Sequence, residues 1–215
     1  MLQVYLVRHG ETQWNAERRI QGQSDSPLTA KGEQQAMQVG ERARSLGITH
    51  IISSDLGRTK RTAEIIAQAC GCDITFDSRL RELDMGVLEK RQIDSLTEEE
   101  EGWRRQLVNG TQDGRIPGGE SMQELSDRVH AALASCLELP QGSRPLLVSH
   151  GIALGCLVST ILGTTRLGGT PVTFAQLLYF PHRLPGKSVA GVWVGGKTAG
   201  DVSHLDAPAL DELQR

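Results

Sequence analysis

Residues 2–12 read Leu2-Gln3-Val4-Tyr5-Leu6-Val7-Arg8-His9-Gly10-Glu11-Thr12, and this stretch indicates the architecture of the whole chain. Its first six residues are mostly apolar and partly β-branched, which is typical of a strand buried on both faces of a sheet. The apolar run stops at Arg8, so a polar loop is expected where the strand ends. His9 therefore lies at a predicted strand end.

Similar strand and helix patterns follow along the chain. Strands are predicted at residues 48–53 and 145–149, and helices at residues 29–46, 58–69, 120–139 and 151–162. This alternation predicts an α/β fold, a three-layer sandwich whose mostly parallel sheet is flanked by helices. Ligands bind such sheets just beyond the C-terminal ends of the strands, where both His9 and His150 are expected.

Length and composition favour a single soluble domain. The 215 residues carry a net charge of −3, with 38% hydrophobic and 23% charged residues, so residues 1–215 are read as one domain without a nucleic-acid partner. The longest apolar run, residues 151–163, is shorter than the ~20 residues of a membrane span. The four cysteines have no zinc-site spacing. We expect a cytoplasmic monomer or homodimer that uses no metal.

An acidic and then basic segment interrupts the strand–helix alternation. It runs from residue 95 to residue 105 and includes Arg104 and Arg105. We interpret it as part of an inserted lid at about residues 87–118. The alternative is a solvated helix face with no functional role.

Four short segments carry the candidate chemistry: residues 8–12, 54–59, 81–86 and 149–151. Two arginines, Arg8 and Arg58, can make charge-assisted hydrogen bonds to phosphate oxygens, worth about 1.5–3 kcal/mol each. A neutral imidazole nitrogen can attack phosphorus and hold the phosphoryl group covalently. Glu82 is the candidate general acid for the leaving oxygen. The set suits a phosphorylated metabolite.

These segments resemble the histidine phosphatase superfamily, in its phosphoglycerate-mutase-like form. The resemblance rests on residues 6–12 with Asn15, Gly22 and the stretch Asp25-x-Pro27-Leu28-Thr29, and continues at residues 54–63 and 149–151. It implies that His9 is the phosphorylated nucleophile, that Glu82 donates and accepts the proton, and that His150 stabilises the transition state. It also implies a set of substrate- and phosphate-binding positions: Arg8, Gly10, Glu11, Thr12, Asn15, Gln21, Gly22, Arg58, Lys60, Arg104, Arg105, Gly151 and Ile152.

The resemblance implies interconversion of 2-phosphoglycerate and 3-phosphoglycerate, with no cofactor except 2,3-bisphosphoglycerate as a candidate primer. Paired Arg104 and Arg105 on the expected lid suit the substrate carboxylate. The alternative is a broad-specificity phosphomonoesterase that uses the same site. A third reading, a phosphate-ligand binder without activity, is disfavoured because His9, Glu82 and His150 are all present.

Residues 164–197 depart from the family pattern, which expects a helix and then edge strands. This anomalous segment is rich in glycine and proline. Our hypothesis is a compensated frameshift in the gene, because another reading frame can encode a family-like helix and strands there. Residues 191–198 match the spacing of a nucleotide-binding loop, but Val192-Trp193-Val194 inside it looks like a strand, which argues against ATP binding.

Overall fold

The computed structural model describes residues 3–108, 114–161 and 177–181. Within these ranges, one sheet has the strand order β3-β2-β4-β1-β5. Its strands are β1 (Gln3–Arg8), β2 (His50–Ser53), β3 (Ile74–Phe76), β4 (Pro145–Ser149) and β5 (Leu177–Pro181). Four strands run parallel, and β5 pairs antiparallel with β1 at the edge. The mostly parallel sheet predicted from the sequence is confirmed.

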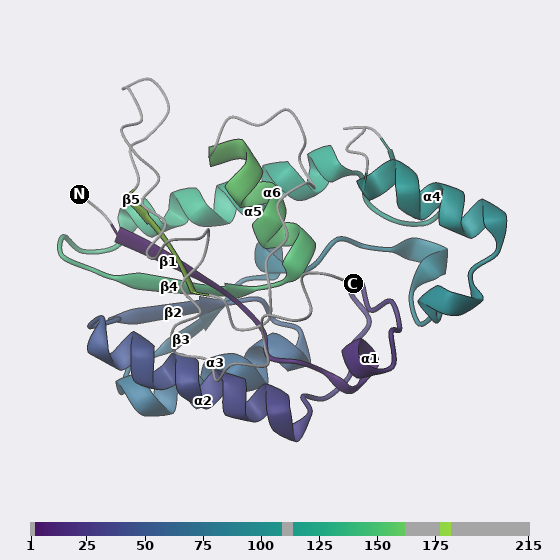
Figure 1. Ribbon diagram of the computed structural model, residues 1–215. Coiled ribbons are helices and arrows are strands. Elements are labelled where there is room, and N and C mark those ends of the chain that lie inside the picture. Colours follow the sequence, from purple (N-terminus) through teal and green to yellow (C-terminus); the bar gives the residue numbers. More distant parts are fainter. Residues whose placement is uncertain (1–2, 109–113, 162–176, 182–215) are drawn as a thin grey trace.

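Helices cover both faces of this sheet (Figure 1). Helices α2 (Ala30–Ser45) and α3 (Gly57–Cys70) pack on one face, and α5 (Met122–Ser135) and α6 (Gly151–Ile161) on the other. Helix α1 (Gln13–Ala16) follows β1, and α4 (Glu98–Val108) lies at the end of the molecule beyond the sheet. Four single turns of 3-10 helix complete the described elements: η1 (Ser78–Leu80), η2 (Gly86–Leu88), η3 (Ile93–Ser95) and η4 (Cys136–Glu138).

Strand β1 explains why the sheet needs a layer on each side. Val4 and Leu6 belong to the apolar core under α5 and α6, whereas Tyr5 and Val7 belong to the core against α2 and α3. Side chains of a strand alternate between faces, so an apolar residue at every position requires two cores. The continuous apolar run therefore accounts for the three layers.

Local signals place most helix ends close to their predicted positions. Thr29 caps α2 by accepting a hydrogen bond from the Gly32 N–H, as the pattern predicted. The segment predicted as one helix over residues 120–139 is divided. There α5 begins after a capping box of Ser121 and Glu124 and gives way to η4 after Ser135.

The segment expected to form a lid contains η2, η3 and α4. Leu107 of α4 is buried, and Trp103 packs against the core under α5 and α6. The segment is therefore more than a solvated helix face, although its opening and closing stay a prediction. Residues 109–113, and all of the anomalous segment except residues 177–181, lie outside the described part of the chain. None of the described helices is long and apolar enough to span a membrane.

Candidate active site

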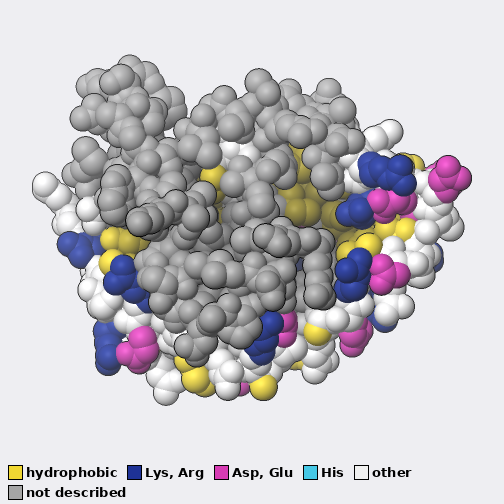
Figure 2. Space-filling model, in the orientation of Figure 1, with side chains coloured by type: hydrophobic (Ala, Val, Ile, Leu, Met, Phe, Trp, Pro, Cys, Tyr) yellow, Lys and Arg dark blue, Asp and Glu magenta, His cyan; other side chains and the backbone are white. Residues whose placement is uncertain are grey.

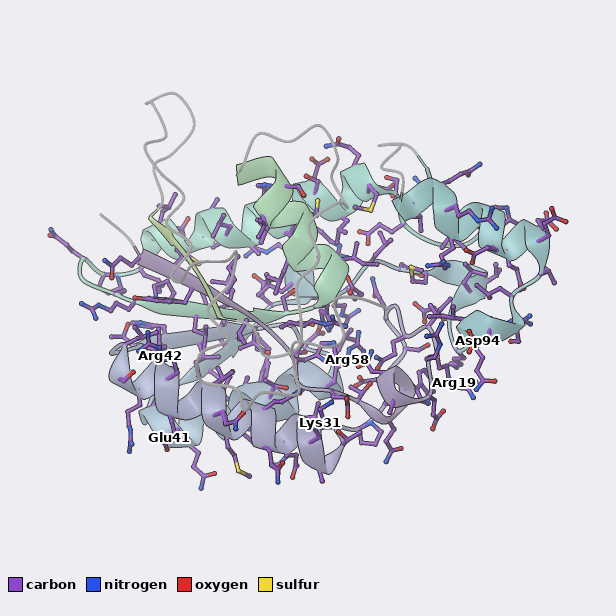
Figure 3. All side chains as sticks on the ribbon, viewed as in Figure 1. Arg19, Lys31, Glu41, Arg42, Arg58 and Asp94 are labelled. Carbon is purple, nitrogen blue, oxygen red and sulfur yellow. The ribbon has the colours of Figure 1, made fainter. Side chains whose placement is uncertain are left out.

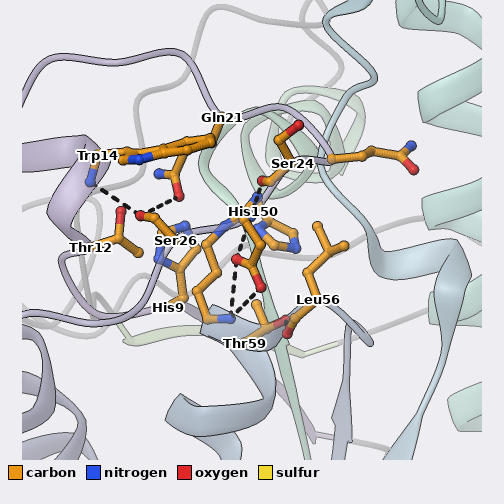
Figure 4. Close-up of polar contacts among 12 residues, drawn as sticks. His9, Thr12, Trp14, Gln21, Ser24, Ser26, Leu56, Thr59 and His150 are labelled. Carbon is orange, nitrogen blue, oxygen red and sulfur yellow. Dashed lines mark hydrogen bonds and ion pairs between the residues drawn. The ribbon is translucent and has the colours of Figure 1, made fainter. Parts of the chain in front are cut away.

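Neighbouring strands bring the two strand-end histidines together. Strands β1 and β4 are adjacent and parallel, with Arg8 paired to Ser149, so the next residue of each strand is a histidine. The His9 N–H donates to the Ser149 carbonyl at 3.0 Å. Figure 4 shows the two histidines in the same site. Their ring centroids are 5.3 Å apart. The predicted pairing of His9 with His150 is thus present.

The His9 imidazole is held in its neutral form. Its Nδ1 lies 2.7 Å from the Gly10 carbonyl oxygen, which can only accept, so Nδ1 carries the proton and Nε2 the lone pair. Burial, and then the charges of Arg58 and Arg8, hold the pKa of His9 well below the ordinary histidine value. The ring is therefore uncharged at neutral pH, as attack on phosphorus requires.

Gly10 is needed for backbone packing. A Cβ at Gly10 would collide with the Gly32 carbonyl group at the start of α2. The Gly10 N–H also donates to Thr62 Oγ1 of α3 at 3.2 Å. The loop after His9 is thus pressed against two helices, which limits the positions open to the His9 ring. This is a different role from the substrate contact that the resemblance implied for Gly10.

Arg58 enters the site from α3 and is almost completely buried (Figure 3). Its Nη1 donates to Asp25 Oδ1 at 2.9 Å and to the Ser24 carbonyl at 2.8 Å, and its Nη2 donates to the Gly22 carbonyl at 2.7 Å. These bonds fix the guanidinium against the loop of residues 22–25. Its Nε is buried with no hydrogen-bond partner among the described residues. A buried donor without a partner is costly, so it marks a place for an acceptor such as a phosphate oxygen.

His150 presents a second buried nitrogen without a partner. Its Nε2 lies 2.8 Å from Ser54 Oγ, whereas its Nδ1 has no partner in the described structure. When the Ser54 hydroxyl donates to Nε2, the proton of the neutral ring sits on Nδ1, which can then donate to a phosphoryl oxygen. Burial, and then the charges of Arg58, His9 and Arg8, lower the pKa of His150 well below its usual value.

The Glu82 carboxylate sits at the N-terminus of α6. Its oxygens accept the N–H groups of Leu83, Ile152 and Ala153 at 2.9, 3.1 and 3.0 Å. Three backbone donors, two of them at the start of α6, fix the direction of the carboxyl group. The Glu82 carbonyl is held in turn by Arg128 Nη2 at 2.8 Å. The predicted proton-transfer group is therefore precisely oriented by backbone and side chain together.

Arg8 is placed by α6 as well. A Cβ at Gly151 would lie 3.2 Å from Arg8 Cζ, a tight contact, so the glycine lets the Arg8 guanidinium lie close over the start of the helix without shifting. Gln21 is oriented on the other side of His9, since its Oε1 accepts from Ser26 Oγ at 3.4 Å, and Ser26 Oγ accepts from the Trp14 N–H at 3.1 Å (Figure 4). Both residues line the site, as the resemblance implied.

A pocket of about 380 Å³ joins these groups. Most of the predicted site residues line it: Arg8, His9, Asn15, Gln21, Gly22, Arg58, Glu82, Arg104, Gly151 and Ile152. His150 reaches the same place through its contact with the His9 ring. Residues from four distant parts of the sequence thus meet in one cavity. Its arginines and neutral imidazoles suit a phosphoryl dianion.

Four other predicted site residues have their side chains directed elsewhere. Glu11 accepts from Thr29 Oγ1 at 2.9 Å and pairs with Lys31 at 3.0 Å, so it joins the loop to α2. Thr12 caps α1. Lys60 Nζ lies 5.2 Å from the centroid of the Phe76 ring. Arg105 is two-thirds exposed. All four, like Gly10, are absent from the described pocket lining.

Several lining residues were not recognised in the sequence. They are Arg19, Ile20, Leu83, Met85, Ile93, Leu107 and Met122. Six of them are apolar and look like ordinary core residues in a sequence. Leu83 and Met85 could have been found from their proximity to Glu82, and Ile93 and Leu107 from their proximity to residues 95–105. Among the described residues, no cluster of three histidine, cysteine, aspartate or glutamate side chains is arranged to hold a metal ion.

Known proteins resemble this chain in sequence and in structure. The family model of the histidine phosphatase superfamily (branch 1) matches residues 4–174. A protein of Salmonella paratyphi B named probable phosphoglycerate mutase GpmB is 85% identical over 220 residues, which cover all of both chains. The structure of Bacillus stearothermophilus YhfR superposes with a TM-score of 0.82 at 31% identity, over 96% of this chain and 100% of that one. A putative alpha-ribazole-5'-P phosphatase from Escherichia coli K-12 gives 0.73 at 26% identity, over 83% and 89%.

Proposed function

The chain belongs to the histidine phosphatase superfamily, and on that premise we propose that it transfers the phosphoryl group of small phosphomonoesters to His9 and then to water. The observation that carries the proposal is the buried, neutral His9 ring beside two buried donors, Arg58 Nε and His150 Nδ1, that lack partners among the described residues. A phosphoryl group bound there would satisfy both donors and face the His9 lone pair.

In the first step, His9 Nε2 attacks phosphorus and the bond from phosphorus to the leaving oxygen breaks. Glu82 in its protonated form gives that oxygen a proton, which releases a neutral alcohol. In the second step, Glu82 as a carboxylate takes a proton from water, the water oxygen attacks phosphorus, and the bond from phosphorus to Nε2 breaks. Arg8, Arg58 and His150 stabilise the charge on the phosphoryl oxygens in both steps.

Interconversion of 2-phosphoglycerate and 3-phosphoglycerate is the second candidate. The name of the Salmonella relative supports it, and the described pocket lining contains two further arginines, Arg19 and Arg104. In this reaction a hydroxyl of the bound glycerate replaces water as the acceptor, and 2,3-bisphosphoglycerate serves as the primer. From the sequence, Arg105 is expected to act with Arg104 in binding the substrate carboxylate. Arg105 is absent from the described pocket lining, which weakens the support for this second candidate.

Product analysis separates the two candidates. The protein is incubated with 3-phosphoglycerate, with and without 2,3-bisphosphoglycerate, and both 2-phosphoglycerate and inorganic phosphate are measured. We expect phosphate to appear faster. Faster appearance of 2-phosphoglycerate would establish the second candidate instead.

Both candidates need a phosphohistidine at residue 9. His9→Asn should abolish turnover of p-nitrophenyl phosphate and the acid-labile, base-stable label on the protein. His50→Gln, at the opposite end of the sheet where β2 begins, is the matched control and should retain both. Labelling that persists in His9→Asn would contradict the assignment.

A further inference from the structure

The pocket has an apolar part that phosphate binding does not explain. Beyond the phosphate-binding groups, its described lining is mostly made of branched or flexible hydrocarbon side chains: Ile20, Leu83, Met85, Ile93, Leu107, Met122 and Ile152. Figure 2 shows an apolar surface next to the charged side chains at the end of the molecule that carries α4. Such a lining favours substrates with an apolar leaving group, because burial of apolar surface away from water is favourable.

Arg104 is a cation in this lining, and its carboxylate-binding edge is already occupied. Its Nε and Nη2 each donate to a different oxygen of Glu101, both at 2.7 Å. This is the side-on, two-bond geometry in which an arginine binds a substrate carboxylate. Arg104 also holds the pKa of Glu101 at about 2, so the pair is ionised at neutral pH.

Arg19, another cation of the lining, is also engaged. Its Nη1 donates to the Lys90 carbonyl at 2.6 Å and its Nε to Glu17 at 3.3 Å, while its guanidinium lies 5.8 Å from the centroid of the Trp14 ring. Figure 3 places it at the same end of the molecule as Asp94. In each of these two arginines, therefore, two of the nitrogens that could bind a leaving-group carboxylate already have partners within the chain.

We propose that Glu101 is a specificity-determining residue: by occupying and neutralising Arg104, it makes the site select phosphomonoesters with an uncharged, apolar leaving group over esters that carry a carboxylate. This inference rests on the proposed phosphoryl transfer through His9. Glu101 itself is absent from the described pocket lining, so it acts through Arg104.

Electrostatics and desolvation act in the same direction. A leaving group with a carboxylate would lose part of its hydration in the apolar part of the pocket and would meet the negative charge of Glu101 just behind Arg104. Arg105 Nε, at 3.4 Å from Glu101 Oε1, offsets some of that charge from the solvent side. An uncharged aryl or alkyl group has no such loss and gains contact with the apolar side chains.

A matched pair of substrates tests the proposal. Phenyl phosphate and 4-carboxyphenyl phosphate differ only by the carboxylate, and the measured quantity is the ratio of their kcat/KM values. We expect the wild-type protein to prefer phenyl phosphate by about ten-fold and Glu101→Gln to remove most of that preference, chiefly through a lower KM for the carboxylated ester. An unchanged ratio in Glu101→Gln would overturn the proposal.

Two further variants make the test specific. Glu41→Gln removes a glutamate that has the same three-residue spacing from its arginine, Arg44, as Glu101 has from Arg104, and it should leave the ratio unchanged. In Arg104→Met, adding Glu101→Gln should no longer improve the carboxylated ester, because the effect acts through Arg104. A gain of the same size without Arg104 would also refute the mechanism.

A binding measurement with phosphonates that cannot be hydrolysed distinguishes failure of this inference from failure of the proposed function. The affinities of phenylphosphonate and 4-carboxyphenylphosphonate, measured by calorimetry, give the same ratio without turnover. If neither phosphate ester is hydrolysed by the wild-type protein, the proposed function is wrong, while the phosphonate ratio still supports or overturns the role of Glu101.

Discussion

Lowering the pH from 7.5 to 5.5 should destabilise the folded chain through its two buried active-site histidines. The pKa values of His9 and His150 are both well below 6.5 in the folded state, because burial and the neighbouring arginines oppose a positive charge there. The unfolded chain binds a proton at each of these residues as the pH falls through 6.5. Below that pH the unfolded state therefore holds more protons, and stability decreases.

The size of this loss follows from linkage. Between pH 7.5 and 5.5, one histidine that titrates only in the unfolded state lowers the free energy of unfolding by about 1.4 kcal/mol. The two together should lower it by about 2.7 kcal/mol, a large part of the 5–15 kcal/mol of a typical domain. The ring centroids are 5.3 Å apart, so protonation of one ring further opposes protonation of the other in the folded state.

Urea unfolding at pH 7.5, 6.5 and 5.5 measures the effect. Replacement of one histidine, His150→Gln, should reduce the loss over this range by about half. The pKa values of carboxyl groups such as Asp55 and Asp77 are lowered in the folded state. These groups lose their stabilising effect as the pH falls toward the ordinary aspartate pKa of 3.8 and below it, so they do not account for a loss centred on pH 6.5. A wild-type free energy of unfolding that stays constant from pH 7.5 to 5.5 would refute the reasoning.

Two further predictions concern proton placement during catalysis. Ser54→Ala removes the hydroxyl 2.8 Å from His150 Nε2 and should lower kcat by roughly 10–100-fold with little change in KM, whereas Ser54→Thr keeps a hydroxyl and most of the activity. Steady-state kinetics and the nitrogen NMR shifts of His150 check this, and an alanine variant with unchanged shifts would contradict the tautomer assignment. Glu82→Gln should slow alkyl phosphates by about 10²–10⁴-fold and p-nitrophenyl phosphate far less, because nitrophenolate leaves without a proton. Equal slowing of both esters, measured as kcat, would count against Glu82 as the general acid.

The sequence alone was sufficient for the architecture and for the position of two histidines just beyond neighbouring strands. The run Val4-Tyr5-Leu6-Val7 within β1, apolar at four successive positions, can be buried only between two layers, and its polar continuation must then lie beyond the C-terminal ends of the strands. Because a histidine directly follows both β1 and β4, parallel pairing of these strands brings His9 and His150 together. Local patterns of this kind need no knowledge of distant contacts.

Only the tertiary structure decided the direction of individual side chains and the character of the rest of the pocket. Glu82 is oriented by N–H groups 70 and 71 residues away, and no local pattern encodes that distance. Glu11 and Lys60 lie beside motif residues but turn to α2 and to the Phe76 ring, because a neighbouring position along the chain leaves the side-chain direction open. The apolar lining and the pairing of Arg104 with Glu101 likewise became visible only after packing, since an apolar residue facing a pocket and one facing the core have the same sequence pattern.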